Sequence, residues 1–89
     1  MYLHIGGGRL IRKKDIIGIF DLDTATVSRH TKRYMNKMSR AGRVSYADAD
    51  LPRSFLLVEN QGEESVELSR ISSVGLCSRT RDGYDTAGD

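Results

Sequence analysis

Residues 25–44, ATVSRHTKRYMNKMSRAGRV, decide the fold because their apolar and basic residues separate on the surface of a helix. With about 100° of rotation per residue, the apolar side chains gather on one side and the basic side chains on the other. The apolar set is Val27, Thr31, Tyr34, Met35, Met38 and Ala41. The basic set is Arg29, Lys32, Arg33, Lys37, Arg40 and Arg43. The segment therefore predicts one long amphipathic helix that packs its apolar side on the rest of the protein.

The charge of this segment is not balanced within it. Residues 26–44 carry six bases and no acid, whereas the whole chain has a formal net charge of only +2. Residues 45–89 carry nine acids against four bases, so the positive charge is concentrated on the helix. Ordinary solvated surfaces mix both signs. A concentrated basic face therefore indicates an anionic partner.

The two ends of the helix have recognisable signals. Asp23 or Thr24 is expected to cap its start, because a short side-chain oxygen accepts a hydrogen bond from an otherwise unpaired N–H. Gly42 suits the left-handed residue that often follows the last turn.

Strand signals surround the helix on both sides. Segments with alternating or β-branched residues are residues 2–5, 9–13, 15–22 and 44–46, and a hairpin of 54–59 with 65–70. Residues 6–8, Gly-Gly-Gly, read as a tight turn, and Gly18 marks a bulge or a close backbone approach within a strand expected to be buried. Residues 71–77 fit a short helix or irregular structure.

These elements predict an α+β fold, a small and mostly antiparallel sheet with one long basic helix. Residues 1–77 form the expected single domain, and the polar residues 78–89 form an expected flexible tail. A domain of this size, poor in large aromatic residues, is marginal as a monomer. We therefore expect a homo-oligomer.

The composition also limits the location and the chemistry. One cysteine, Cys77, cannot form an internal disulfide, which suits a reducing cytoplasm. The apolar runs are too short to span a bilayer, and no signal peptide is apparent at the N-terminus. The apolar side of the helix has neither Leu nor Trp to anchor it, so a membrane surface is not the expected partner.

The chain offers no constellation of residues for catalysis. The glycines at 6–8 lack the spacing and the Lys-Ser/Thr pair of a phosphate-binding loop. His4, His30 and Cys77 share no metal-ligand spacing, and no nucleophile stands beside a base. We expect no enzyme, no cofactor, no metal and no small-molecule substrate.

Two longer stretches carry a family resemblance. MYLHIGGGRLIRKKDIIGIFDLDTATVSRHTKRYM at residues 1–35 and LPRSFLLVENQGEESVELSRISS at residues 51–73 resemble the RemA/RemB family of small bacterial regulators. The resemblance implies a cytoplasmic DNA-binding regulator of transcription that acts on extracellular matrix and biofilm genes. It also implies a fold like that of LytTR-type DNA-binding domains and assembly into rings. The basic loop of the family corresponds here to DADLPR at residues 48–53, in which only Arg53 is basic.

Two functions remain open at this point. In the first, the protein binds duplex DNA, and the candidate contacts are Lys13, Lys14, Arg29, Lys32, Arg33, Arg40, Arg43 and Arg53. In the second, the protein is a ring-forming structural subunit, and its basic helix face binds the acidic half of a neighbouring copy instead of DNA.

Overall fold

The computed structural model of this chain describes residues 1–25 and 28–81, and a β-hairpin lies at its centre. Strands β5 (Ser54–Asn60) and β6 (Glu63–Ser69) pair antiparallel across a two-residue turn. Both turn residues have positive φ, 53° at Gln61 and 81° at Gly62. Such turns match the natural twist of the two strands. The predicted hairpin is confirmed.

One further strand joins each side of this hairpin. Strand β3 (Ile16–Asp21) pairs antiparallel with β5, and β4 (Val44–Tyr46) pairs parallel with β6. The sheet order is therefore β3-β5-β6-β4, a mixed sheet in which two of the three pairings are antiparallel. The prediction that β3 is buried is wrong, because it is an edge strand and Ile17 is 52% exposed. The register shifts between Ile16 and Gly18, so the predicted irregularity is confirmed.

Strands β1 (Tyr2–His4) and β2 (Leu10–Arg12) form a separate antiparallel pair. The glycines at positions 6, 7 and 8 all have positive φ, which confirms the predicted turn. The turn packs closely, since a Cβ on Gly7 would overlap the carbonyl oxygen of Ala47. A single 3-10 turn, η1 (Lys13–Asp15), then leads into β3.

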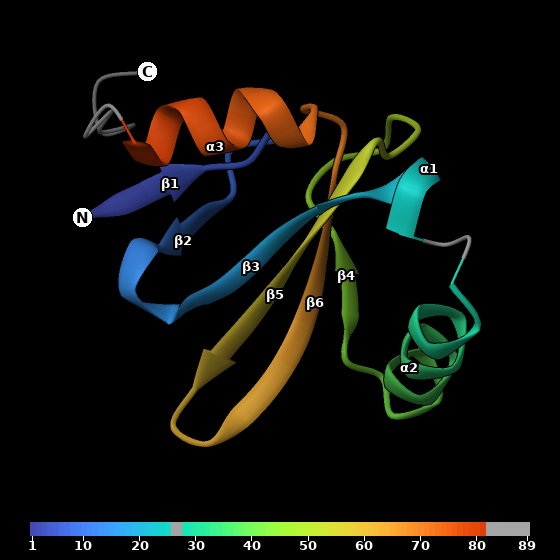
Figure 1. The fold of residues 1–89 in the computed structure, drawn as a ribbon. Coiled ribbons are helices and arrows are strands. Elements are labelled where there is room, and N and C mark those ends of the chain that lie inside the picture. The colour runs from blue at the N-terminus through green and yellow to red at the C-terminus, as the bar shows by residue number, and fades with distance from the viewer. Residues whose placement is uncertain (26–27, 82–89) are drawn as a thin grey trace.

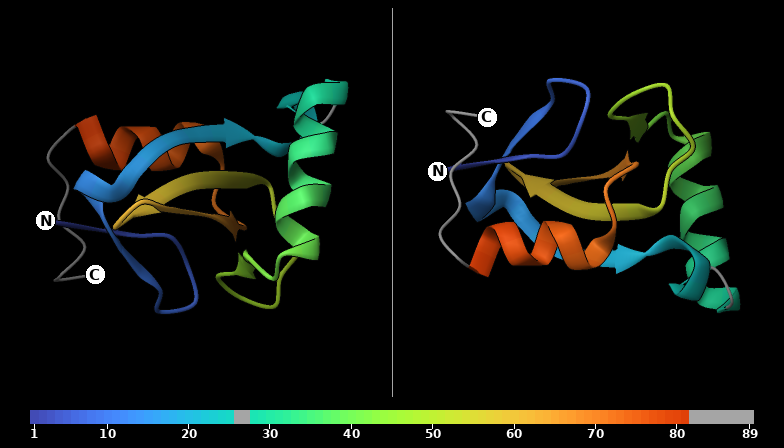
Figure 2. Two further views of the ribbon diagram at one scale, coloured as in Figure 1. Left: turned by 90° about the horizontal axis from the view of Figure 1, so that it is seen from below. Right: turned by 90° about the horizontal axis from the view of Figure 1, so that it is seen from above.

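Helices cover the two faces of the four-stranded sheet (Figures 1 and 2). Helix α2 (Arg29–Arg40) packs on one face, and α3 (Ser73–Arg81) with the β1–β2 pair packs on the other. A four-residue helix, α1 (Leu22–Ala25), precedes α2. The α+β class is confirmed. The single long helix predicted for residues 25–44 is wrong, because α2 has only 12 residues and α1 is separate.

Two apolar clusters lie on opposite faces of the sheet because side chains alternate along β5. The first cluster contains Leu3, Ile5, Ile11, Leu56, Val58 and Leu76. The second, beneath α2, contains Met38, Phe55, Val66 and Leu68. Burying one such side chain contributes about 1.5–3 kcal/mol. Both faces therefore contribute to the stability of the fold.

The C-terminal helix extends past residue 77, the expected end of the domain. Helix α3 continues through residues 78–81, which were expected to begin a flexible tail. The guanidinium of Arg79 donates a hydrogen bond of 2.9 Å to the carbonyl oxygen of His4, so this part of α3 is tied to β1. The remaining tail, residues 82–89, lies outside the described residues.

Candidate nucleic-acid interface

Helix α2 begins and ends through local hydrogen bonds. Its N-cap is Ser28, whose hydroxyl accepts from the backbone N–H of His30 at 3.2 Å. The prediction that Asp23 or Thr24 caps this helix is therefore wrong. At the other end Gly42 has φ +72°, and the N–H of Arg43 donates to the carbonyl oxygen of Met38 at 2.9 Å. This left-handed ending confirms the role predicted for Gly42.

The apolar side of α2 lies on the sheet as expected. Met38 is 5% exposed within the cluster beneath the helix, and Thr31, Tyr34 and Met35 are half-buried. Ala41 was assigned to this face but is exposed, because the helix ends at the preceding residue. Val27, assigned to the same face, lies outside the described residues.

The opposite side of α2 is a cationic surface, which we call the basic face. It consists of Arg29, Lys32, Arg33, Lys37 and Arg40, all exposed, and the helix contains no acid. Within residues 1–25 and 28–81, none of these five forms an ion pair. Five positive charges therefore stand together in solvent without a counter-charge from the part of the chain that the structure describes.

Arg43 does not belong to the basic face. It lies beyond the end of α2, where its Nε donates to the backbone carbonyl of Glu64. Its Nη2 donates to the Glu63 carboxylate at 3.1 Å. The prediction that it extends the cationic side of the helix is wrong, because Gly42 turns the chain away. Arg43 instead fixes the loop after α2 to β6.

The other predicted contacts lie elsewhere on the molecule. Lys13 and Lys14 belong to η1, which stands at the opposite end of the protein from α2 in both views of Figure 2. Arg53 is exposed at the start of β5, and its carbonyl oxygen accepts from the N–H of Leu22 in α1. One protomer therefore does not bring Lys13 and Lys14 together with the basic face.

The acidic loop after β4 has a partner in the same chain. Arg70 Nε lies 3.0 Å from the Asp48 carboxylate and 3.6 Å from that of Asp50. The Asp48 side chain is only 15% exposed and lies against the glycine turn at Gly6. The two acids therefore fasten the β4–β5 loop to the end of β6.

Tyr34 connects the helix to the hairpin. Its hydroxyl donates a hydrogen bond of 2.8 Å to the Glu64 carboxylate. Partial burial, together with this bond to an anion, raises the pKa of Tyr34 to about 12. The hydroxyl of Tyr34 thus stays protonated at physiological pH, and its hydrogen bond to Glu64 links α2 to β6.

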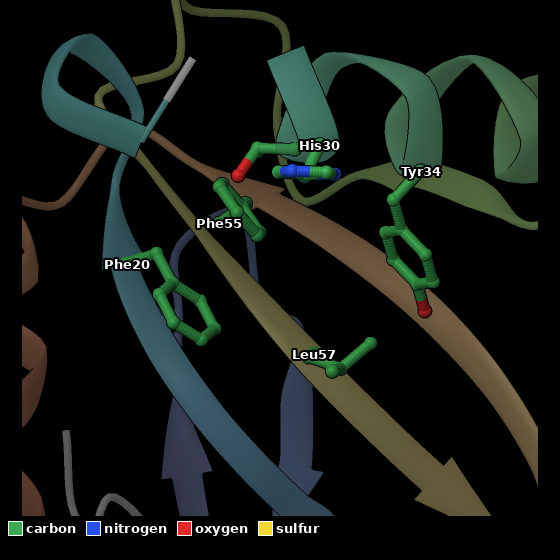
Figure 3. Close-up of a pocket in the computed structure, with 6 residues that line it drawn as sticks. Phe20, His30, Tyr34, Phe55 and Leu57 are labelled. Carbon is green, nitrogen blue, oxygen red and sulfur yellow. The ribbon is translucent and has the colours of Figure 1, made fainter. Parts of the chain in front are cut away.

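An aromatic groove lies between α2 and strands β3 and β5, and sequence reasoning missed it (Figure 3). It has a volume of about 230 Å³ and is lined by Phe20, His30, Thr31, Tyr34, Phe55 and Leu57. The β3–β5 register sets Phe20 opposite Phe55, and their rings stack with centroids 5.0 Å apart. These two residues are 35 positions apart in the sequence. Only the strand pairing brings them together, so no local pattern signals the groove.

No protein-family model and no curated protein matches this chain. Among residues 1–25 and 28–81, no three His, Cys, Asp or Glu side chains are grouped so as to hold a metal ion. No helix in the described part of the chain has the length and apolar character needed to cross a membrane.

Proposed function

We propose that this protein is a DNA-binding regulator that contacts the phosphates of duplex DNA through the basic face of α2. The observation that carries the proposal is the set of five exposed cations on one helix with no acid. Phosphate contacts with Lys and Arg supply most of the sequence-independent affinity of such proteins. A face of this kind favours backbone contacts over the reading of base edges.

Some of these charges stand where they lower the stability of the helix. Arg29, Arg33 and Lys37 follow one another at four-residue spacing, and like charges at this spacing cost about 0.2–0.5 kcal/mol per pair. Arg29 also stands in the first turn, where the helix dipole disfavours a cation. A helix arranged only for stability would carry acids at some of these positions, so the arrangement supports a binding role.

The resemblance to the RemA/RemB family supplies the biological part of the proposal: a cytoplasmic regulator of extracellular matrix and biofilm genes, acting as a homo-oligomer. In an oligomer, Lys13 and Lys14 of one copy reach the same DNA only where assembly sets their surface beside the basic face of another copy. Exposed apolar residues give such an assembly surfaces to bury, among them Tyr46, Leu51 and Val74 at 64%, 86% and 74% exposure.

The alternative is a structural subunit whose basic face binds acids of a neighbouring copy. Of the six acids between residues 45 and 81, five already bind a partner in their own chain. These are Asp48, Asp50, Glu63, Glu64 and Glu67. To bind any of these five acids, a neighbour's basic face would have to displace those contacts. Binding to DNA requires no such exchange, and we therefore favour it.

The test measures duplex DNA affinity by fluorescence anisotropy over a range of salt concentrations. Binding through Z phosphates gives a slope of log K against log salt of about −0.9Z. We expect Arg33→Ala to reduce the steepness of that slope by about 1 for promoter and random duplexes alike. Arg12→Gln is the matched control, since Arg12 is exposed but already paired with Asp15 at 3.2 Å. An unchanged slope for Arg33→Ala would remove the basic face as the DNA surface.

A further inference from the structure

The aromatic groove is open because α2 covers the sheet unevenly. The helix packs toward β4 and β6, and it leaves Phe20 on the edge strand β3 40% exposed. In Figure 3 the rings of Phe20 and Phe55 lie beside each other on the sheet, while His30 and Tyr34 descend from α2. The groove therefore has an aromatic floor and a wall made by one side of the helix.

The position of Phe20 depends on Gly18. A Cβ built on Gly18 would lie 2.7 Å from two carbons of the Phe20 ring, closer than real contacts allow. The ring thus lies close to the bare backbone at Gly18 and stacks on Phe55 at an interplanar angle of 24°. Phe20 is fixed as a flat apolar platform at the mouth of the groove, with little ordering left to occur on binding.

The same wall of α2 continues into the basic face. Arg33 follows His30 by three residues and Lys37 follows Tyr34 by three, and residues at this spacing are neighbours on a helix surface. Lys32 lies on the other side of the helix, next to Met35. Arg33 and Lys37 therefore lie next to residues that line the groove, and they are four residues apart, about 6 Å along the helix axis.

We infer that the groove binds one unpaired nucleobase of a nucleic acid strand whose phosphates lie on Arg33 and Lys37. An aromatic floor beside a cationic ridge is the combination by which proteins hold single strands, since every base presents a π-face for stacking. The volume of about 230 Å³ is smaller than the roughly 300–1,000 Å³ of sites for drug-sized ligands, which suits a single base. This inference rests on the proposed function, because it uses the basic face for the phosphates.

The experiment compares three labelled ligands by anisotropy at one low salt concentration: a short oligothymidylate, an abasic strand of the same length, and a duplex. The thymidylate and abasic strands carry the same phosphates, so their affinity ratio isolates the base. Stacking of one base is worth about 1–3 kcal/mol, which corresponds to a ratio of about five-fold or more. A ratio near one with intact duplex binding overturns this inference and leaves the proposed function standing. Failure to bind any of the three overturns both.

Variants locate the base within the protein. Phe20→Leu keeps apolar cover over Phe55 but removes the ring, and we expect the thymidylate-to-abasic ratio to fall close to one. His30→Ala, at an exposed position on the wall, is a second variant with a smaller expected fall. The control is Tyr46→Leu, which removes an exposed aromatic ring from the opposite edge strand and leaves the ratio unchanged.

The variants also distinguish a base from other occupants. Arg33→Ala is expected to weaken all three ligands by similar factors, because it acts through phosphate. If Phe20→Leu keeps the wild-type ratio, the groove is not the base site. If it instead changes the mass of the free protein in light scattering while the ratio persists, the occupant is a second copy, and the inference is overturned.

Discussion

Arg9 donates hydrogen bonds to both carboxylate oxygens of Glu67, from Nε at 3.0 Å and from Nη2 at 2.7 Å. The Glu67 side chain is 4% exposed, whereas that of Arg9 is 47% exposed. The pKa of Arg9 is raised by this hydrogen bond and by the charge of Glu67. A carboxylate in the middle of β6 is thus tied to the β1–β2 hairpin, 58 residues away in the sequence.

Removal of Arg9 should destabilise the fold strongly. Arg9→Met leaves the Glu67 carboxylate buried without its partner. Breaking a fully buried pair costs about 3–5 kcal/mol, and we expect about 2–3 kcal/mol here because Arg9 is half exposed. The double variant Arg9→Met/Glu67→Leu should recover part of that loss. Urea denaturation of the single and double variants measures both effects, and additive losses would contradict the pairing.

Two adjacent glycines should respond very differently to alanine. Gly7 and Gly8 both have positive φ, but a Cβ on Gly7 would overlap the Ala47 carbonyl and lie 2.8 Å from the Asp48 Cβ. No atom lies within 4 Å of the Gly8 position. Gly8→Ala should therefore cost about 1–2 kcal/mol of backbone strain, and Gly7→Ala considerably more. Similar denaturation midpoints for the two variants would mean that the turn does not pack on this loop.

Substitutions on the apolar side of α2 should reduce stability, whereas substitutions on its basic face should reduce DNA binding. Met38→Ala empties a buried site and is expected to cost about 2–5 kcal/mol. Lys37→Ala changes an exposed residue and should alter stability by about 0.5 kcal/mol or less while lowering DNA affinity. Thermal unfolding and anisotropy on the same samples check both expectations. A large loss of stability in Lys37→Ala would show that its side chain is not solvent-facing.

Acid should weaken the link between η1 and the hairpin turn. Asn60 Nδ2 donates to Asp15 at 3.0 Å, and this bond, followed by that from Arg12, lowers the pKa of Asp15 below its ordinary value of 3.8. A lowered folded-state pKa contributes stability above the unfolded-state value, and this contribution disappears as pH falls through the folded value. Asn60→Ala should therefore raise the Asp15 pKa, measured by NMR titration. The stability difference from wild type should shrink below about pH 4.

The last turn of α3 should matter for stability. A chain that ends at Ser78 lacks Arg79 and its hydrogen bond to the His4 carbonyl, whereas a chain that ends at Arg81 keeps them. We expect the shorter chain to be less stable by about 1 kcal/mol or more. Thermal unfolding of the two truncated chains gives the comparison directly, and equal midpoints would show that the contact is dispensable.

The local sequence pattern was sufficient to predict most helices and strands, but it did not predict how the strands pair. The hairpin of residues 54–69 and the ending at Gly42 follow from neighbouring residues, so they were predictable. The start of α2 at Arg29 was not predictable, because Ser28 competes with Asp23 and Thr24 as the N-cap. Helix propensities do not show which of these polar residues caps the helix. The parallel pairing of β4 with β6 arises from long-range packing and has no signature in three residues.

The candidate site could likewise be predicted only where it depends on one element. Helical periodicity identified the five cations of the basic face, because charge and exposure follow the helix repeat. The same periodicity wrongly added Arg43 to this face, because it was continued past Gly42, where the helix has already ended. Arg43 pairs instead with Glu63 in β6. The aromatic groove escaped prediction because Phe20 and Tyr34 belong to different elements whose distance depends on the whole sheet.

The central place of the β5–β6 hairpin has a consequence for the order of folding. Its two-residue turn brings the strands together by a local closure, and isolated hairpins form in about 1–10 μs. Strand β3 joins β5 only after the chain from residue 22 to 53 has closed a long loop, which carries a larger entropic cost. We expect Leu57 and Val66 to be structured in the folding transition state and Met35 to join afterwards. Substitutions in the hairpin should then slow folding, whereas substitutions in α2 should mainly speed unfolding.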